Sequence, residues 1–387
     1  MKILKFIIFS LLAILICIIL FYAFTDNISK TENTSSESFT NNNWLEIPIL
    51  INGIKTKAIF DTGAQFSVLN ESSCQKFGVF QFPVNFIKVN NQTFHKFGII
   101  SKLHINNLEF KNVIVILIDF KNEDTQLKCI DSELILGMHI IKKTIWKFDN
   151  KNLKFTNLKK NDIDSTNYTN EIKYSDNYTP LTNIKIDNQI YPVLIDFGYN
   201  STVSISFKKL TKDRQNNYIN TSCSNIFGKL KDTGKTILTD LILNKDTLEN
   251  LAVDYTKSNL NIIGNQAFKY YTVVTVHPFN KEIKLLNKTQ PNKSKYFFNH
   301  GFYFDKVSNT IKISFLNINS TTYKYGLRIG DEITRINNVK SDSILKKLDY
   351  CSFIQWRSEV FRLDTIKLTI NREGKLIDFE IRKLKYK

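Results

Sequence analysis

The sequence predicts a mainly β protein built from two similar lobes that face one another. Residues 51–61 and 186–196 superpose without a gap, and each segment ends an apolar run in an aspartate followed by X-Gly. Each copy is followed by two apolar residues and a glycine, at residues 135–137 and 262–264. Repeats of this length are whole lobes. Frequent Ile, Phe, Tyr and Val, with only 6 prolines and 13 glycines, favour strands over helical bundles.

The N-terminus is predicted to be a membrane anchor. After Lys2 and Lys5 the chain carries no charge from Phe6 to Phe24, a length that spans a bilayer. Bulky residues surround Ala23 where a signal peptide would have a small-residue cleavage site. Residues 1–25 are therefore expected to form a cytoplasmic tip and a single transmembrane helix. The positive-inside rule then places the body on the extracytoplasmic, periplasmic side.

Polar stretches divide the rest of the chain. Residues 26–43 are rich in Ser, Thr and Asn, which predicts a flexible linker. Two further polar stretches, one at residues 159–179 and one just before residue 296, predict domain boundaries. The remaining segments are a first lobe at residues 44–158, an inter-lobe linker at 159–179, a second lobe at 180–290 and a C-terminal domain at 296–387.

Composition argues against several other classes of function. The net charge of +17 comes from scattered lysines without a nucleic-acid motif, so no nucleic-acid partner is expected. The five histidines lie far apart without metal-ligand spacing, and neither a metal nor a cofactor is predicted. The segment 228–236 has five residues between its glycines instead of the four of a phosphate-binding loop. Its Asp232-Thr233-Gly234 is interpreted as a hairpin turn without a catalytic role.

The cysteines do not form a disulfide framework. Cys17 lies inside the predicted anchor, and Cys74, Cys129, Cys223 and Cys351 are spread over the rest of the chain. A Cys74–Cys129 bond is one pairing that export would allow.

The repeat brings one aspartate to the same point of each lobe. Residues 58–64 read Ala-Ile-Phe-Asp-Thr-Gly-Ala, and residues 193–199 read Val-Leu-Ile-Asp-Phe-Gly-Tyr. Facing lobes would bring Asp61 and Asp196 together, and two carboxylates in contact share one proton because they cannot both ionise cheaply. One can then act as a general base on a water molecule while the protonated partner polarises a carbonyl group.

Phe60-Asp61-Thr62-Gly63-Ala64, together with residues 135–137, resembles the retropepsin-like aspartic proteases. The resemblance covers roughly residues 44–290 and is to the bacterial form with both lobes on one chain ahead of a PDZ-like domain. It implies two β-barrel lobes with an active-site cleft between them, and an aspartic endopeptidase that needs no cofactor. The implied catalytic residues are Asp61 and Asp196, with loop support from Thr62, Gly63, Ala64, Phe197, Gly198, Gly137 and Gly264.

The second lobe departs from the family pattern at one position. Thr62 in the family donates a hydroxyl hydrogen bond to the opposite lobe, whereas Phe197 stands where Thr or Ser is expected and cannot reciprocate. Clefts of this family are covered by a flap hairpin. The polar turn Asn90-Asn91-Gln92 is predicted to be its tip in the first lobe, with residues 224–228 as the counterpart in the second.

Residues 323–337 resemble the Gly-Leu-x-x-Gly-Asp-x-Ile-x-x-Ile-Asn core of a PDZ domain. This resemblance implies a small α+β domain whose loop Gly301-Phe302-Tyr303-Phe304 receives the carboxylate end of a peptide through backbone N–H groups. The alternative is a β domain that only packs against the lobes.

Three functions remain open from the sequence. The first is a membrane-anchored aspartic endopeptidase that acts on peptides or proteins outside the cytoplasm, with the PDZ-like domain recruiting a partner. The second is a catalytically inactive peptide- or protein-binding module, which Phe197 supports. In the third, a second chain supplies the partner of Asp61, and the ungapped repeat around Asp196 disfavours it.

Overall fold

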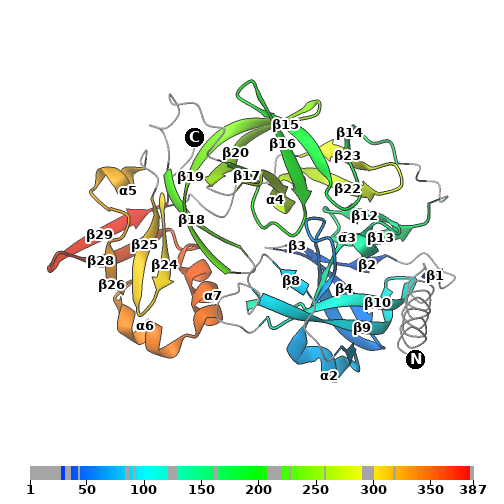
Figure 1. The fold of residues 1–387 in the computed structure, drawn as a ribbon. Helices are drawn as coiled ribbons and strands as arrows, with labels where there is room; N and C mark the ends of the chain where they lie inside the picture. The colour runs from blue at the N-terminus through cyan, green and yellow to red at the C-terminus, as the bar shows by residue number, and fades with distance from the viewer. Residues whose placement is uncertain are drawn as a thin grey trace, which may run out of the picture.

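The computed structural model describes residues 28–30, 36–41, 44–82, 87–89, 93–120, 129–160, 164, 166–206, 219–225, 228–256, 259–289, 300–316 and 320–383. It shows a mainly β protein, as predicted. Two β lobes, blue to cyan and green to yellow in Figure 1, lie beside a C-terminal unit drawn in yellow to red. Among these residues no helix is long and apolar enough to cross a membrane. The predicted anchor at residues 1–25 lies outside the described part of the chain.

The first lobe is a closed ring of six strands. Neighbours pair in the order β10-β6-β11-β5-β4-β9, and β9 pairs back with β10. Short helices follow strands of the ring: η1 (Glu71–Ser73), α2 (Cys74–Phe77) and α3 (Met138–Ile141). β7 (Phe80–Gln81) pairs antiparallel with β9. The ring strands are β4 (Leu45–Ile51), β5 (Ile54–Phe60), β6 (Val68–Asn70), β9 (Thr93–Ile105), β10 (Leu108–Ile118) and β11 (Leu134–Leu136).

The second lobe repeats this ring strand for strand. Its order is β15-β16-β21-β17-β20-β19, and β19 pairs back with β15. Helix α4 (Asn265–Phe268) follows the last strand of the ring, as α3 does in the first lobe. β18 (Ile219–Asn225) pairs antiparallel with β19. The ring strands are β15 (Leu181–Ile186), β16 (Gln189–Asp196), β17 (Val203–Ser206), β19 (Gly228–Leu243), β20 (Asp246–Thr256) and β21 (Ile262–Gly264).

The first hairpin of each lobe follows from its turn residues. Asn52-Gly53 joins β4 to β5, and Asp187-Asn188 joins β15 to β16 at the equivalent point of the repeat. All four residues have positive φ, which a two-residue turn matching the twist of the strands requires. In β4, buried and partly exposed residues alternate, so one face of the strand fills the core of the ring. Local sequence therefore specifies the strand pair that carries each aspartate.

A third sheet joins the two lobes. Its order is β14-β23-β22-β12-β13-β2, which is symmetric about the central β12–β22 pair. In that antiparallel pair Trp146 lies opposite Val276 and Phe148 opposite Val274. Hydrogen bonding across this pair makes the lobes one continuous structure. Its strands are β2 (Glu37–Ser38), β12 (Ile145–Asp149), β13 (Lys154–Leu158), β14 (Asn170–Lys173), β22 (Tyr271–His277) and β23 (Glu282–Lys288).

Both predicted linkers contribute strands. Within residues 26–43, β1 (Ile28–Lys30) pairs with β10, β2 with β13 and β3 (Thr40–Asn41) with β4. In the predicted linker at 159–179, β14 pairs with β23. These strands are two to four residues long and lie at or beside sheet edges, so they carry no apolar periodicity of their own. Their strand conformation comes from partners distant in the sequence.

The second Asp-Thr-Gly segment is part of a strand. Residues 232–234, predicted to be a hairpin turn, lie inside β19, where Cys223 of β18 is opposite Asp232 and Thr221 is opposite Gly234. The connection between β18 and β19 falls instead at residues 226–227, outside the described residues. The turn-like composition of this segment was outweighed by its pairing with β18.

The cysteines pair differently from the suggested Cys74–Cys129 bond. Cys129 is bonded to Cys351, which joins the first lobe to the C-terminal domain across 222 residues of sequence. Cys74 on α2 is a buried free thiol whose pKa is raised to about 11, chiefly by burial. Linear spacing could not reveal this pairing, because the two half-cystines belong to different domains.

The C-terminal domain is α+β with its own core. Its sheet runs β24-β25-β26-β28-β29, with β27 attached to β26, and its buried side chains form a cluster separate from that of the lobes. The elements are β24 (Phe302–Val307), β25 (Thr310–Leu316), α5 (Thr321–Lys324), β26 (Glu332–Ile336), β27 (Val339–Lys340), α6 (Ser341–Lys347), α7 (Tyr350–Val360), β28 (Thr365–Arg372) and β29 (Lys375–Arg382).

Candidate active site

The two aspartate loops lie where equivalent parallel strands end. β5 pairs with β11, and the backbone N–H of Asp61 donates to the carbonyl of Leu136 at 3.0 Å. β16 pairs with β21, which places Asp196 opposite Gly264. Each apolar-apolar-Gly segment thus lies beside an aspartate loop, because it forms the neighbouring strand of the ring. Because the strands follow the same order along the chain in both lobes, the same local arrangement occurs twice.

The glycines of these segments are required by close packing. A Cβ at Gly137 would lie 2.5 Å from the carbonyl carbon of Phe66, and one at Gly264 would lie 2.6 Å from the carbonyl oxygen of Tyr199. The turn residues after the two aspartates therefore pass directly over these glycines. Neither position has room for a side chain.

The two aspartates face one another across the lobe interface. A Cβ at Gly63 would lie 2.5 Å from Cγ of Asp196, and a Cβ at Gly198 would lie 2.5 Å from Oδ2 of Asp61. Each carboxyl group therefore packs on the glycine that follows the other aspartate by two residues. The structure brings the two predicted catalytic residues into one site, with the intrachain symmetry that the repeat predicted.

Each carboxyl group accepts hydrogen bonds from backbone N–H groups of its own loop. Oδ1 of Asp61 accepts from the backbone N–H groups of Gly63 at 2.8 Å and Ala64 at 2.9 Å. The Asp61 and Asp196 side chains are hydrogen-bonded to each other. Oδ1 of Asp196 is buried and has no hydrogen-bond partner among the residues that the structure describes. The backbone N–H groups of Gly198 and Tyr199 also donate to the carboxyl group of Asp196, so each carboxyl group is held by the turn that follows it.

Burial and proximity raise the pKa of both carboxyl groups. Burial is the main cause for Asp61, and the hydrogen bond from Asp196 and the Gly63 and Ala64 N–H groups act in the opposite direction. The pKa of Asp196 lies well above its ordinary value because of burial first and the charge of Asp61 second. The two groups titrate as a pair. Between the two titration steps the pair shares one proton.

Thr62 connects the two loops. Its Oγ1 donates to the carbonyl of Ile195 at 2.7 Å and accepts from the backbone N–H of Phe197 at 3.0 Å. These atoms flank Asp196 on both sides, so the hydroxyl of the first lobe fixes the backbone of the second. The bridge needs only the backbone of Phe197.

The side chain of Phe197 is buried in aromatic contacts. Its ring centroid is 4.6 Å from that of Phe268 and 5.9 Å from that of Phe60. Burial of a phenyl ring contributes about 1.5–3 kcal/mol, and an aromatic pair adds about 0.5–1.5 kcal/mol. A threonine at this position would gain hydrogen bonds worth about 1 kcal/mol each. The contacts of the Phe197 ring therefore stabilise this position at least as much as the hydrogen bonds of a hydroxyl residue would.

An asparagine network behind the loops had no signal in the sequence. Nδ2 of Asn265 donates to Oδ1 of Asn41 at 2.6 Å, and Nδ2 of Asn150 donates to the carbonyl of Tyr271 at 2.9 Å. Asn41 and Asn150 are themselves within hydrogen-bond distance, at 3.5 Å. The three amides come from β3, the turn after β12 and α4, so only the tertiary structure assembles them.

The predicted flap lies partly outside the described residues. Asn90, Asn91 and Gln92 are not described, but β8 (Ile87–Val89) and β9 pair on either side of them, with Val89 opposite Thr93. In the second lobe Asn225 lies opposite Gly228 at the ends of β18 and β19. The strands on either side of each predicted tip therefore pair antiparallel, and the role of both segments as flaps stays a prediction.

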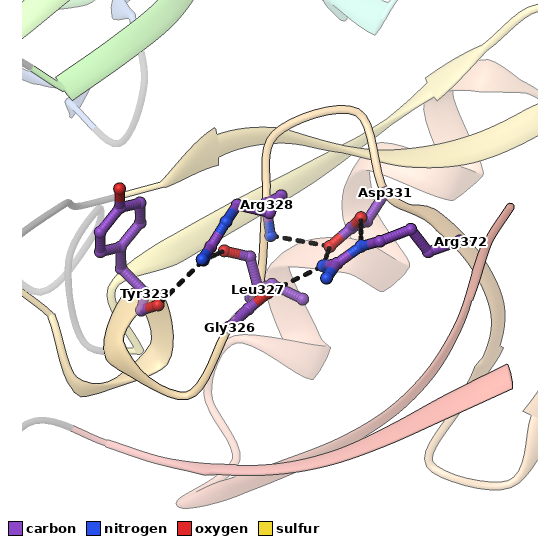
Figure 2. Close-up of polar contacts among 6 residues, drawn as sticks. All are labelled: Tyr323, Gly326, Leu327, Arg328, Asp331 and Arg372. Atoms are coloured by element: carbon purple, nitrogen blue, oxygen red, sulfur yellow. Dashed lines mark hydrogen bonds and ion pairs between the residues drawn. The ribbon is translucent and has the colours of Figure 1, made fainter. Parts of the chain in front are cut away.

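The Gly-Asp turn of the C-terminal domain is a structural element. Figure 2 shows Asp331 receiving two hydrogen bonds from Arg372, at 2.6 and 2.8 Å, and one from the backbone N–H of Arg328 at 2.7 Å. Arg372 also donates to the carbonyl of Gly326 at 2.8 Å. Asp331 is buried, so this ion pair holds the turn between α5 and β26. The motif that resembles a PDZ domain thus stabilises the fold of this domain.

The predicted peptide-binding loop is packed against α7. Phe302 and Phe304 are buried in the core, and Tyr303 stacks on Phe361 with ring centroids 5.0 Å apart. Nη1 of Arg357 donates to the carbonyl of Phe304 at 3.2 Å and pairs with Asp305 at 2.7 Å. Gly301 adopts φ +73°, where a Cβ would contact Ser320. Peptide capture by this loop stays a prediction.

Comparison with known proteins supports the protease-like character of the first lobe. Residues 47–143 match the family model described as "gag-polyprotein putative aspartyl protease". This range includes Asp61, Thr62, Gly63 and Gly137. The first lobe is therefore aspartyl-protease-like, and the family resemblance drawn from its motif is supported there.

A solved structure also matches part of the chain. The crystal structure of a retropepsin-like aspartic protease from Rickettsia conorii has 19% sequence identity and a TM-score of 0.26, covering 35% of this chain and 97% of that one. No curated protein matches the sequence. Support for the aspartyl-protease-like first lobe comes from the family model and from the geometry of Asp61 and Asp196. Among the described residues no cluster of three or more His, Cys, Asp or Glu side chains forms a metal site.

The raised pKa values predict how stability depends on pH. A carboxyl group whose folded-state pKa is raised stabilises the fold below its unfolded pKa, and that contribution is lost as pH rises through the folded pKa. We expect Asp196→Asn to be more stable than the wild type at pH 8, by at least about 1 kcal/mol, and to lose this advantage near pH 4. Urea denaturation at both pH values measures the difference. An advantage that is equal at both pH values would contradict the coupled pair.

Proposed function

We propose that this chain is an aspartic endopeptidase in which Asp61 and Asp196, on one chain, activate water to hydrolyse peptide bonds. The observation that carries the proposal is the reciprocal packing of each carboxyl group on the other loop's glycine, with a hydrogen bond between the two side chains. A buried carboxyl pair that shares one proton is suited to simultaneous general acid and general base chemistry.

In this proposal each aspartate has one role. The Asp61 carboxylate, held by two backbone N–H groups, takes a proton from the attacking water. The proton on Asp196 passes to the carbonyl oxygen of the substrate as the water oxygen bonds to the carbonyl carbon. When the tetrahedral species breaks its C–N bond, Asp61 returns its proton to the leaving nitrogen and a hydroxyl proton of the intermediate returns to Asp196. The pair then regains its starting state.

We further propose that the enzyme is membrane-anchored and acts outside the cytoplasm. The uncharged segment from Phe6 to Phe24 supports the anchor. The Cys129–Cys351 disulfide is typical of an oxidising compartment such as the periplasm. In this proposal the C-terminal PDZ-like domain recruits a peptide or protein partner.

A second candidate is a catalytically inactive binding module that holds peptides in the same cleft. The presence of Phe197 in place of the expected hydroxyl residue favours it. The two candidates agree on the fold and on peptides as the ligand, and differ only in whether the carboxyl pair catalyses hydrolysis of the bound peptide.

Cleavage of a diverse peptide library by the full chain, from acidic to neutral pH, tests the proposal. Wild type is compared with Asp61→Asn and Asp196→Asn, and with Asp232→Asn as a matched control, because Asp232 belongs to the other Asp-Thr-Gly segment. We expect either dyad substitution to abolish cleavage and Asp232→Asn to preserve it. Loss with Asp61→Asn alone would assign the partner aspartate to a second chain. Tight peptide binding without cleavage in the wild type would favour the binding module.

A further inference from the structure

The side chain of Phe197 lies where the two aspartate strands approach each other. Phe197 directly follows Asp196, and Phe60 directly precedes Asp61. Their ring centroids are 5.9 Å apart at an interplanar angle of 78°, an edge-to-face contact across the lobe interface. Both side chains are buried. One aromatic contact therefore joins the immediate chain neighbours of both carboxyl groups.

The same ring is anchored inside its own lobe. Phe197 stacks on Phe268 with centroids 4.6 Å apart and planes 24° from parallel. Phe268 belongs to α4, which follows the Ile-Ile-Gly strand beside the Asp196 loop. The ring of Phe197 thus fills the space between the helix of the second lobe and the aspartate strand of the first.

Phe60 is in turn fixed to the sheet that joins the lobes. Its ring is 5.1 Å from that of Trp146 and 5.0 Å from that of Phe148, both edge-to-face. Both partners are on β12, which pairs with β22 of the second lobe at the centre of that sheet. Movement of one aspartate loop relative to the other therefore requires this packed group to rearrange.

We infer that Phe197 is a positioning residue, and that the aromatic brace Phe60–Phe197–Phe268 replaces the second cross-lobe hydroxyl in holding Asp61 and Asp196 together. The inference builds on the proposed protease function for its activity readout. Thr62 still supplies one hydroxyl bridge, to the carbonyl of Ile195 and the N–H of Phe197. The dyad is thus held by a hydroxyl from one lobe and a ring from the other, and a hydroxyl residue at position 197 would remove the ring.

The test compares Phe197→Leu and Phe197→Thr with wild type, using full chains. Phe110→Leu is the matched control, because Phe110 is an equally buried ring on β10 of the first lobe. We expect Phe197→Leu to lower kcat by about 10- to 100-fold with KM changed less than about threefold, because small misplacements of reacting groups have effects of this size. We expect Phe197→Thr to be no better, and Phe110→Leu to stay within about threefold of wild type.

A second readout does not depend on cleavage. Carbon-13 NMR titration of labelled aspartate carboxyl groups, assigned through Asp61→Asn and Asp196→Asn, reports the separation of the two protonation steps. We expect the steps to move closer together in Phe197→Leu, because separated carboxyl groups couple less strongly. Phe268→Leu, which removes the stacked partner and changes neither aspartate loop, is expected to act in the same direction. It keeps the test decisive if Phe197→Leu fails to fold.

The outcomes separate the brace from the protease activity. Unchanged titration steps in both Phe197→Leu and Phe268→Leu would overturn the brace, whether or not the wild type cleaves peptides. A Phe197→Thr variant with kcat equal to or above that of the wild type would also overturn it. Steps that converge in Phe197→Leu and Phe268→Leu, together with no cleavage by the wild type, would support the brace while rejecting the proposed endopeptidase activity.

Discussion

Gly198→Ala is expected to abolish peptide cleavage, with kcat/KM reduced by at least about 1,000-fold. The new Cβ would lie 2.5 Å from Oδ2 of Asp61, which real atoms do not tolerate, so the carboxyl pair must separate. Gly63→Ala should act alike, because its Cβ would meet the carboxyl group of Asp196 at 2.5 Å. Overpacking of this kind destabilises by about 1–3 kcal/mol, so the chain should remain folded while activity is lost.

Gly53→Ala is the control for the glycine substitutions. Gly53 lies in the β4–β5 turn with φ +85° and no atom within 4 Å of an added Cβ. Its replacement should cost about 1 kcal/mol of stability through backbone strain and leave kcat/KM near that of the wild type. Steady-state kinetics and urea denaturation of the three variants make the comparison. An active Gly198→Ala enzyme would show that the carboxyl contact is not needed for catalysis.

Phe39→Ala is expected to lower the free energy of unfolding by about 3–5 kcal/mol, although residue 39 lies in a stretch whose composition predicts a flexible linker. The side chain is 3% exposed, and its ring lies 5.5 Å from that of Phe148. The backbone N–H of Phe39 donates to the carbonyl of Leu153 at 2.9 Å. The segment is therefore an integral part of the first lobe and of the sheet that joins both lobes.

Ser38→Ala provides the matched control for Phe39→Ala. Ser38 is the adjacent residue on β2, is exposed and pairs with Lys154 through its backbone, which alanine retains. Its replacement should change the free energy of unfolding by less than about 0.5 kcal/mol. Urea denaturation of both variants at one pH gives the values. A loss below 1 kcal/mol for Phe39→Ala would mean that residues 36–41 do behave as a linker.

Features carried by local patterns could be predicted from the sequence. The apolar run that ends in Asp-X-Gly gave both aspartate loops, and the recurring apolar-apolar-Gly segment gave the two-lobe repeat. Asn52-Gly53 forms a two-residue hairpin turn of the kind that Asn-Gly favours. In each case the determining interactions lie within a few residues along the chain, so burial periodicity and turn chemistry record them.

Features that depend on partners distant in the sequence could not be predicted in this way. Asp232-Thr233-Gly234 has the residues of a turn, yet it lies in β19 because β18 pairs with it residue by residue. Cys351 bonds to Cys129 of another domain, which no spacing rule reveals. The polar segments at β2 and β14 became strands because exposed sheet edges accept any backbone that can pair.

The sequence by itself determined where the two carboxyl groups would be and that they would be equivalent, because a strand, a glycine turn and a repeat are local properties of the chain. Only the tertiary structure decided how the pair is held. From the sequence, Phe197 could be interpreted only as a missing hydroxyl, since its role in holding the carboxyl pair depends on its contacts with Phe60 and Phe268. Packing between segments distant in the sequence decides that role, and a linear pattern does not show which side chains will be in contact.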